Sequence, residues 1–213
     1  CIYAVEAGSG FLLAGVARNV MVFGAEKLSS IINWNDRSTC VLFGDGAGAV
    51  ILGAADEGSG FLATRLHSDG GGADALIVRA GGVRCPITGD GNDIPEEDRF
   101  IAMDGRRVYN FAVQANTELL KGLLEDAGIG IDQVKYIVPH QANVRIIMAA
   151  AKRAGIPLEK FYLNIEEYAN TSAASIPIAL NDLWQKGELT KGDIILTLGF
   201  GSGLTYGGQV IRL

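Results

Sequence analysis

The sequence predicts an α/β protein, and three observations support this class. Short apolar runs of strand length alternate along the chain with segments whose apolar residues recur at helical spacing. Apolar residues make up 48% of the 213 residues, which is enough to bury a sizeable core. Residues 39–52 resemble residues 194–213, because each segment has the pattern of a strand, a Gly-x-Gly-x-Gly turn and a second strand. This internal echo predicts two similar halves.

The first part of the chain, residues 1–67, predicts one helix and several strands. The helix is expected at residues 2–17, where small and apolar side chains indicate a buried element. The strands are expected at residues 19–25, 39–43, 49–52 and 61–67. We interpret residues 1–67 as the remainder of a first half and residues 68–105 as an irregular connecting segment. We expect residues 68–100 to be the least regular part of the chain and to be exposed. They include an acidic stretch at residues 90–98.

The second half is expected at residues 106–213, where helices and strands alternate regularly. Apolar side chains from Val108 to Leu119 recur every three or four residues, and Gly128 ends this helix. A second helix starts at Val144 and stops at Gly155. The other expected elements are strands at 136–138 and 162–165, a helix at 175–186, and paired strands at 194–198 and 205–213.

The composition excludes several classes of protein. The 18 basic and 24 acidic residues give a net charge of −6, which argues against nucleic-acid binding through bulk charge. The longest weakly polar runs are about half of the ~18 residues that a membrane-spanning helix needs. Three cysteines without a Cys-x-x-Cys pair and two histidines predict no disulfide framework and no metal site. This cysteine usage fits the reducing cytoplasm.

His140 and Asn170 are the strongest candidates for chemistry. Each lies in a polar loop between a predicted strand and a predicted helix, where α/β folds place their sites. Each also has a local alternative, as a partly exposed helix cap at His140 and as a member of an N-cap cluster at Asn170. Because both loops are expected at the same end of one sheet, we favour a joint site.

The glycine turn at residues 199–203 offers backbone N–H groups that could hold an oxyanion. It does not match the dinucleotide-binding fingerprint, because its spacing is Gly-x-Gly-x-Gly and a strand follows it instead of a helix. Arg37 and Arg145 lie in or next to polar loops and could meet a phosphate or an acidic protein, with a plain solvated surface role as the alternative.

Five motifs, in order along nearly the whole chain, resemble β-ketoacyl-acyl carrier protein synthase III. They are GAEKLS (24–29), DRST (36–39), FGDGAGA (43–49), PHQAN (139–143) and NTSAASIP (170–177). The resemblance implies a thiolase-like fold with two duplicated α/β halves in layers of helices and sheets, which agrees with the internal echo. The chain resembles the C-terminal two-thirds of such a protein, so its first half is expected to be incomplete.

The resemblance implies a condensing acyltransferase that initiates fatty acid synthesis. A cysteine takes an acyl group from acyl-CoA, and malonyl-acyl carrier protein then loses CO₂ and attacks that group to give 3-oxoacyl-acyl carrier protein. Coenzyme A enters as a substrate thioester, not as a bound cofactor, and a homodimer is expected. Two alternatives stay open: a related synthase that makes another metabolite, and a non-catalytic fragment or partner chain that lacks the nucleophile.

The resemblance also implies roles for individual residues. His140 and Asn170 would donate hydrogen bonds to the malonyl thioester oxygen, and the backbone N–H near Ser202 would hold the tetrahedral oxyanion. Arg145 would meet the carrier protein, and Phe200 would border the acyl site. Coenzyme A would contact Arg37 at its nucleotide end and Met103, Gly105, Arg106, Tyr109 and Asn143 along its pantetheine arm.

The nucleophile motif of that family, Cys-x-Gly-aromatic, is not intact at the start of the chain. An ungapped match over residues 2–29 puts Cys1 at the aromatic position, three residues after the nucleophile. Cys1 is therefore either that position or the nucleophile itself with three residues absent before Ile2. Ala169 and Tyr206 also depart from the family pattern, which usually has Gly and Trp there, and neither change removes a reacting group.

Overall fold

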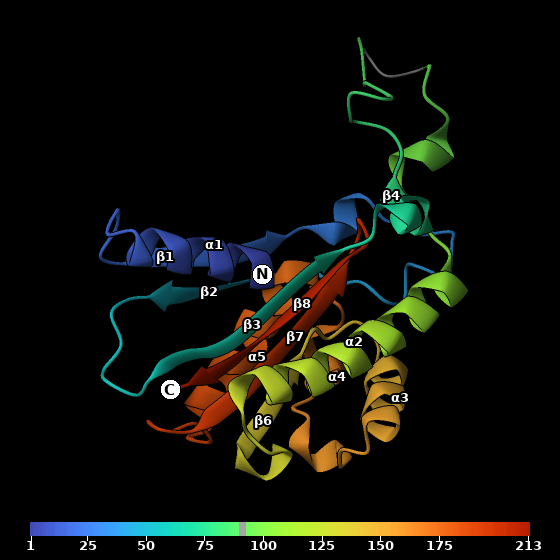
Figure 1. The fold of residues 1–213 in the computed structure, drawn as a ribbon. Helices are drawn as coiled ribbons and strands as arrows, with labels where there is room; N and C mark the ends of the chain where they lie inside the picture. Colours follow the sequence, from blue (N-terminus) through green and yellow to red (C-terminus); the bar gives the residue numbers. More distant parts are fainter. Residues whose placement is uncertain (90–92) are drawn as a thin grey trace.

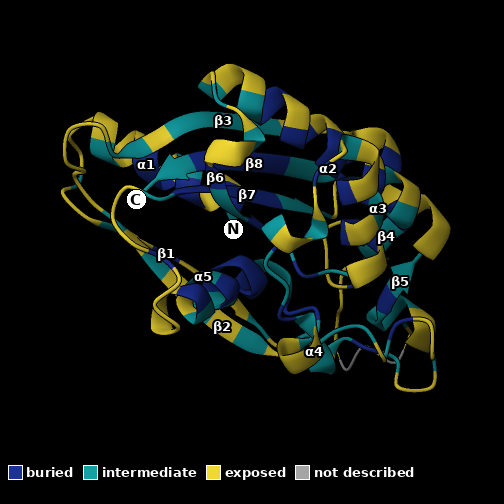
Figure 2. Cartoon of the chain, turned by 90° about the horizontal axis from the view of Figure 1, so that it is seen from below, coloured by how far each residue is buried: buried dark blue, intermediate teal, exposed yellow. Residues whose placement is uncertain are grey.

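The computed structural model describes residues 1–89 and 93–213, and its elements form alternating layers of sheet and helix (Figures 1 and 2). A two-stranded sheet packs on a layer that holds two helices, and these helices pack on one face of a four-stranded sheet. Two further helices cover its other face. The helices between the sheets are α1 (Ile2–Leu13) and α5 (Ser175–Gln185), and the outer ones are α2 (Gly105–Ala127) and α3 (Val144–Ala154).

The two-stranded sheet pairs β1 (Val20–Glu26) with β2 (Gly46–Leu52) in antiparallel register. The prediction of a strand at residues 39–43 is wrong. The strand-turn-strand pattern expected for residues 39–52 is therefore wrong as well. Asp36 accepts hydrogen bonds through its backbone carbonyl from the N–H groups of Thr39 and Cys40, and its carboxylate accepts from Ser38 and Thr39. These bonds close residues 39–43 into turns, so this segment cannot pair with β2 as a strand. Strand β1 is the partner of β2 instead.

The four-stranded sheet has the order β3-β8-β7-β6, with β6 and β7 parallel and the other pairs antiparallel. Its strands are β3 (Gly60–Ser68), β6 (Val134–Pro139), β7 (Ile194–Gly201) and β8 (Thr205–Arg212). The predicted pair at the C-terminus is confirmed as the β7–β8 hairpin. Strand β3 belongs to this four-stranded sheet and not to the two-stranded sheet. The predicted boundary of the first half at residue 67 stays a prediction.

Strand β7 is the central element of the core because side chains on both of its faces are buried. Leu196 and Leu198 pack in the cluster beneath α2 and α3, and Ile195 packs in the cluster that includes residues of α1 and α5. This two-sided burial explains the nearly continuous apolar sequence of the strand. The four-stranded sheet thus lies between two helical layers (Figure 2).

The prediction of a strand at residues 162–165 is also wrong. Phe161 makes one parallel bridge to Ile137, and the chain then turns into the short helix α4 (Ile165–Tyr168). The backbone carbonyl of Asn164 accepts the N–H groups of Glu167 and Tyr168, which is the start of helical hydrogen bonding. The sheet therefore ends at the edge strand β6.

The helix ends follow the polar and glycine residues that flank them. Asp104 caps α2 by accepting the N–H of Arg107 at 3.0 Å, and Asn143 caps α3 by accepting the N–H of Arg145 at 2.9 Å. Gly128 and Gly155 follow these helices with φ of +64° and +71°. Helix α1 stops before the predicted residue 17, because the chain turns at Gly15 with φ of +69°.

The connecting segment contains more structure than predicted. Strands β4 (Leu76–Val78) and β5 (Ile101–Met103) form a small antiparallel pair, flanked by the 3₁₀ helices Gly70–Ala75 and Glu96–Arg99. Residues 79–89 and 93–100, between these strands, project away from the sheets (Figure 1). The predicted acidic stretch at 90–98 lies partly outside the described residues. In the part of the chain that is described, no helix is long and apolar enough to cross a membrane.

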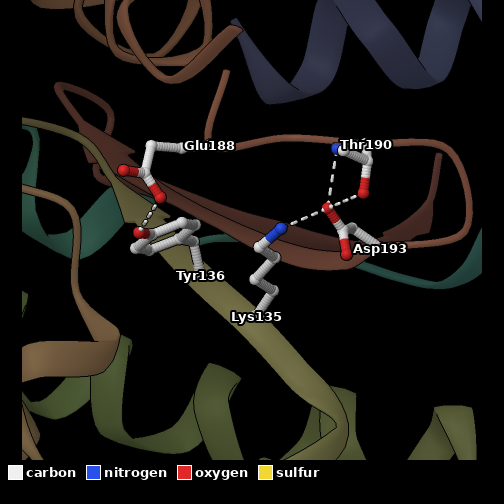
Figure 3. Close-up of polar contacts among 5 residues, drawn as sticks. All are labelled: Lys135, Tyr136, Glu188, Thr190 and Asp193. Atoms are coloured by element: carbon white, nitrogen blue, oxygen red, sulfur yellow. Dashed lines mark hydrogen bonds and ion pairs between the residues drawn. The ribbon is translucent and has the colours of Figure 1, made fainter. Parts of the chain in front are cut away.

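A polar cluster joins the first residues of β6 to the loop before β7 (Figure 3). Lys135 Nζ donates to Asp193 Oδ2 at 2.7 Å, and Tyr136 donates its hydroxyl proton to Glu188 at 3.0 Å. The same Asp193 oxygen accepts the backbone N–H and the hydroxyl of Thr190. These donors lower the pKa of Asp193, the hydrogen bond from Lys135 most. The cluster holds the β6–β7 register at the end of the strands opposite His140.

Candidate active site

A cavity of about 570 Å³ lies where β6 and β7 end. The start of α1, the loop after β6, the loop before α5, the β7–β8 turn and the β4–β5 pair all contribute to its wall. Most of the wall is apolar, with side chains such as Ile31, Phe43 and Ile101. The residues singled out from the sequence that line it are Cys1, Met103, Gly105, Tyr109, His140, Asn143, Asn170, Phe200 and Ser202.

Three arginines singled out from the sequence are not among the described residues that line this cavity. Arg37 lies in the turn region before β2, Arg106 in the first turn of α2, and Arg145 in the first turn of α3. All three are exposed. Their contacts with coenzyme A or a carrier protein therefore stay predictions.

His140 stands directly after β6, and its backbone N–H donates to the carbonyl of Leu198 in β7 at 2.7 Å. Its Nδ1 is 2.6 Å from the hydroxyl oxygen of Ser175, and Phe200 packs edge-on with ring centroids 5.4 Å apart. Burial lowers the pKa of His140 to about 4. The imidazole is therefore neutral at pH 7. Because Asn143 and not His140 caps α3, the helix-cap alternative does not describe this residue.

Gln141 holds the His140 loop in place and was missed by the sequence reasoning. Its side-chain amide donates to the carbonyls of Pro139 at 2.9 Å and Tyr162 at 3.1 Å, and its oxygen accepts the N–H of Asn164. The side chain is only 1% exposed. A buried amide with these bonds gives the loop one conformation.

Asn170 is fixed through its backbone and its side chain. Its N–H donates to the carbonyl of Leu42 and its carbonyl accepts the N–H of Gly44, both at 3.0 Å. Its Oδ1 accepts the N–H of Ser172 at 2.9 Å, so the Nδ2 hydrogens remain to serve the cavity. Helix α5 begins after Ala174, so Asn170 is not its N-cap.

Glycines let the two-stranded sheet approach the loop that carries Asn170. A Cβ atom at Gly24 would lie 2.6 Å from the carbonyl carbon of Ala173. A Cβ atom at Gly48 would lie 2.8 Å from the Cβ of Pro177, in the first turn of the helix α5 that follows this loop. Any larger side chain at these positions would displace the loop. Gly24 and Gly48 therefore allow the close packing that positions Asn170.

The cavity therefore brings together a neutral imidazole, a side-chain amide, the glycine turn and the start of a helix. Such groups stabilise negative charge on a carbonyl oxygen in an apolar surrounding. Among residues 1–89 and 93–213, no group of three or more His, Cys, Asp or Glu residues is placed to hold a metal ion. The side chains that line the wall are suited to acyl-transfer chemistry.

The fold is that of the thiolase-like condensing enzymes. The structure superposes on the synthase III of Thermus thermophilus with a TM-score of 0.89 and 41% identity, covering 100% of this chain and 64% of that one. With the Aquifex aeolicus enzyme the TM-score is 0.87, with 42% identity and coverage of 100% and 63%.

The family follows from the sequence comparison. Residues 1–70 match the profile of 3-oxoacyl-[acyl-carrier-protein] synthase III, and residues 124–213 match the profile of its C-terminal region. A curated relative, the β-ketoacyl-[acyl-carrier-protein] synthase III of Caldanaerobacter subterraneus subsp. tengcongensis, is 45% identical over 211 residues, which are 99% of this chain and 63% of the relative. The chain belongs to the 3-oxoacyl-[acyl-carrier-protein] synthase III family. It spans about 63–64% of the length of the curated relatives that it matches.

Proposed function

We propose that the protein containing this chain condenses an acyl-CoA with malonyl-acyl carrier protein, releases CO₂ and CoA, and forms the 3-oxoacyl-acyl carrier protein that starts fatty acid synthesis. The observation that carries the proposal is that His140 and Asn170, from separate loops, line one apolar cavity at the end of the four-stranded sheet. We place the reaction in the cytoplasm and expect a homodimer.

In the first half-reaction, a cysteine thiolate attacks the acyl-CoA carbonyl and CoA leaves as its thiolate. The start of α1 contributes to the cavity wall, and a helix N-terminus stabilises a thiolate. The nucleophile is either Cys1 or, following the family motif, a cysteine three residues before it. The backbone N–H near Ser202 holds the oxyanion of the tetrahedral intermediate.

In the second half-reaction, the malonyl thioester loses CO₂ and negative charge builds on its thioester oxygen. The neutral imidazole of His140 and the Nδ2 group of Asn170 donate hydrogen bonds to that oxygen. The enolate carbon then attacks the acyl-cysteine carbonyl, a carbon–carbon bond forms, and the cysteine thiolate is released. Donors on a rigid sheet edge are already oriented when the charge appears.

The substrates also meet residues around the cavity. Met103, Gly105, Tyr109 and Asn143 contact the pantetheine arm, and Phe200 borders the acyl group. Arg106 contacts the same arm from the first turn of α2, and Arg37 meets the nucleotide end of coenzyme A. Arg145, exposed next to the His140 loop, pairs with the acidic carrier protein.

The test measures the two half-reactions separately in the protein at its full natural length. Labelled acyl-CoA reports acylation, and peptide mapping of the labelled protein identifies which cysteine carries the acyl group. CO₂ release from malonyl-acyl carrier protein reports decarboxylation. We expect His140→Ala to lower decarboxylation by about 10²–10³-fold and to leave acylation largely unchanged.

The control is Asn110→Ala, at an exposed position of α2 outside the cavity wall, which should leave both half-reactions unchanged. If His140→Ala lowers both half-reactions equally, His140 activates the cysteine and the assigned role is wrong. If the unaltered full-length protein neither takes up label nor releases CO₂, the non-catalytic alternative replaces the proposal.

A further inference from the structure

Ser175 is the first residue of α5 and is 2% exposed, yet its hydroxyl contacts the imidazole that faces the cavity. Its Oγ lies 2.6 Å from His140 Nδ1 and 2.9 Å from the carbonyl oxygen of Ser172. It also accepts the N–H of Gln141 at 3.4 Å. The hydroxyl has a single proton, so it can donate to His140 or to Ser172 but not to both.

The two arrangements give different tautomers of His140. If the hydroxyl donates to Ser172, Nδ1 must carry the ring proton and donate to Oγ, and a neutral ring then has a bare Nε2. If the hydroxyl donates to Nδ1, the ring proton is on Nε2. The structure shows no partner for Nε2 among the described residues, and His140 lines the cavity. The choice therefore decides whether His140 presents a donor or an acceptor to a substrate.

One observation favours donation to His140. The Ser172 carbonyl already accepts the backbone N–H of Ser175, so it keeps a donor when the hydroxyl turns away. Because the imidazole is neutral at pH 7, it offers a proton to the cavity only in the Nε2–H form.

We infer that Ser175 is a positioning residue whose hydroxyl donates to Nδ1 of His140 and holds the neutral ring as the Nε2–H tautomer. This tautomer presents the donor that the decarboxylation step uses, and in this respect the inference rests on the proposed function. The tautomer itself is a property of the protein without substrate, so it can be tested separately. Ser175 touches no reacting atom and acts only through His140.

The test uses the full-length protein with ¹⁵N-labelled histidine. This chain contains two histidines, and the His140 signals are assigned by their loss in His140→Ala. In the unaltered protein at pH 7, we expect long-range ¹H–¹⁵N correlations to show His140 protonated on Nε2. In Ser175→Ala the Nε2–H form should lose its dominance, and Ser175→Thr, which keeps a hydroxyl, should restore it.

The matched control is Thr171→Val, which removes a buried hydroxyl in the same loop for which the described residues offer no partner. It should leave the His140 signals unchanged. In kinetic assays, Ser175→Ala should lower the decarboxylation rate by about 10–100-fold, less than removal of the donor itself, with KM for malonyl-acyl carrier protein and the acylation rate nearly unchanged. Ser175→Thr should recover most of the loss.

An Nδ1–H tautomer in the unaltered protein would overturn the inference, even if the protein condenses its substrates as proposed. An unchanged tautomer in folded Ser175→Ala would overturn it as well. Loss of condensing activity in the unaltered protein would instead refute the proposed function, and the tautomer measurement would stand. The two failures are therefore distinguishable.

Discussion

Phe43 and Asn170 form a parallel backbone bridge between segments 127 positions apart in the chain. The N–H of Asn170 donates to the residue before Phe43, and the carbonyl of Asn170 accepts from the residue after it. The bridge fixes the Asn170 backbone, while the bond from Ser172 orients its amide. A residue proposed to contact substrate is thus positioned by the turn region that precedes β2.

The lowered pKa of His140 predicts a pH dependence of the ring and of stability. Its folded-state pKa of about 4 lies below the ordinary value of 6.5, because burial disfavours the charged imidazole. The contribution of the neutral His140 ring to the free energy of unfolding is fully present above pH 6.5. As the pH falls from 6.5 to 4, the unfolded chain binds a proton that the folded protein does not, so the free energy of unfolding decreases by up to about 3 kcal/mol.

An NMR titration of the histidine ring protons measures this directly. The His140 signals should stay unchanged from pH 8 to about pH 5.5 and then shift with a midpoint near pH 4. A midpoint close to 6.5 would show that the ring is solvated and that the cavity does not exclude its charged form.

Gly24→Ala should destabilise the protein by about 1–3 kcal/mol, because the new methyl group would collide with the backbone of Ala173. Urea denaturation measures the change. Gly10→Ala is the matched control, since nothing lies within 4 Å of that Cβ position in α1 and alanine favours a helix. The control should be neutral or stabilising, and an equal loss in both variants would contradict the prediction.

Ala169→Gly should stabilise the protein by about 1–2 kcal/mol. Ala169 has φ of +57° and ψ of −162°, a conformation that glycine adopts with little strain and other residues avoid. Thermal unfolding should show a higher Tm for Ala169→Gly and a lower one for Ala7→Gly, where an exposed residue of α1 loses helix propensity. A lower Tm in both variants would show that Ala169 is not strained.

The isolated chain of residues 1–213 should self-associate or bind a partner. One face of the two-stranded sheet carries Met21, Phe23 and Ile51 with 62%, 65% and 74% of their surface exposed. Met21 and Ile51 are directly opposite each other in register, so the apolar surface is continuous across the strands. Sedimentation of the chain should show oligomers that Phe23→Lys reduces.

Val83→Lys is the control, because Val83 is fully exposed and lies after β4, outside the two-stranded sheet. It should leave the oligomers unchanged. A monomeric, cooperatively melting sample of the unaltered chain would contradict the prediction.

The helices and the C-terminal hairpin could be predicted because their signals are local. The apolar spacing of α2 and the glycine after it depend only on neighbouring residues. The two wrong strands had apolar sequences of the right length, but a strand also needs a partner. Residues 39–43 were closed into turns by hydrogen bonds to Asp36, and the chain after Asn164 enters the helix α4, whose first hydrogen bonds go to the Asn164 carbonyl.

The candidate site was predicted only in part for the same reason. His140 and Asn170 could be found because each stands in a specific motif, and the structure places both on one cavity wall. Ser175 and Gln141 were missed as contributors, because their roles depend on hydrogen bonds to residues 35 and 23 positions away. Such contacts leave no periodic pattern in the sequence.

The sequence by itself determined the α/β class, most of the elements, the family resemblance and the residue types at the site, since all of these depend on side-chain chemistry and local spacing. Tertiary structure alone decided which strands pair, how closely β1 and β2 approach the Asn170 loop, and which groups surround His140. Those properties arise from packing between segments distant in the chain, where a missing Cβ or a single buried hydroxyl changes the geometry.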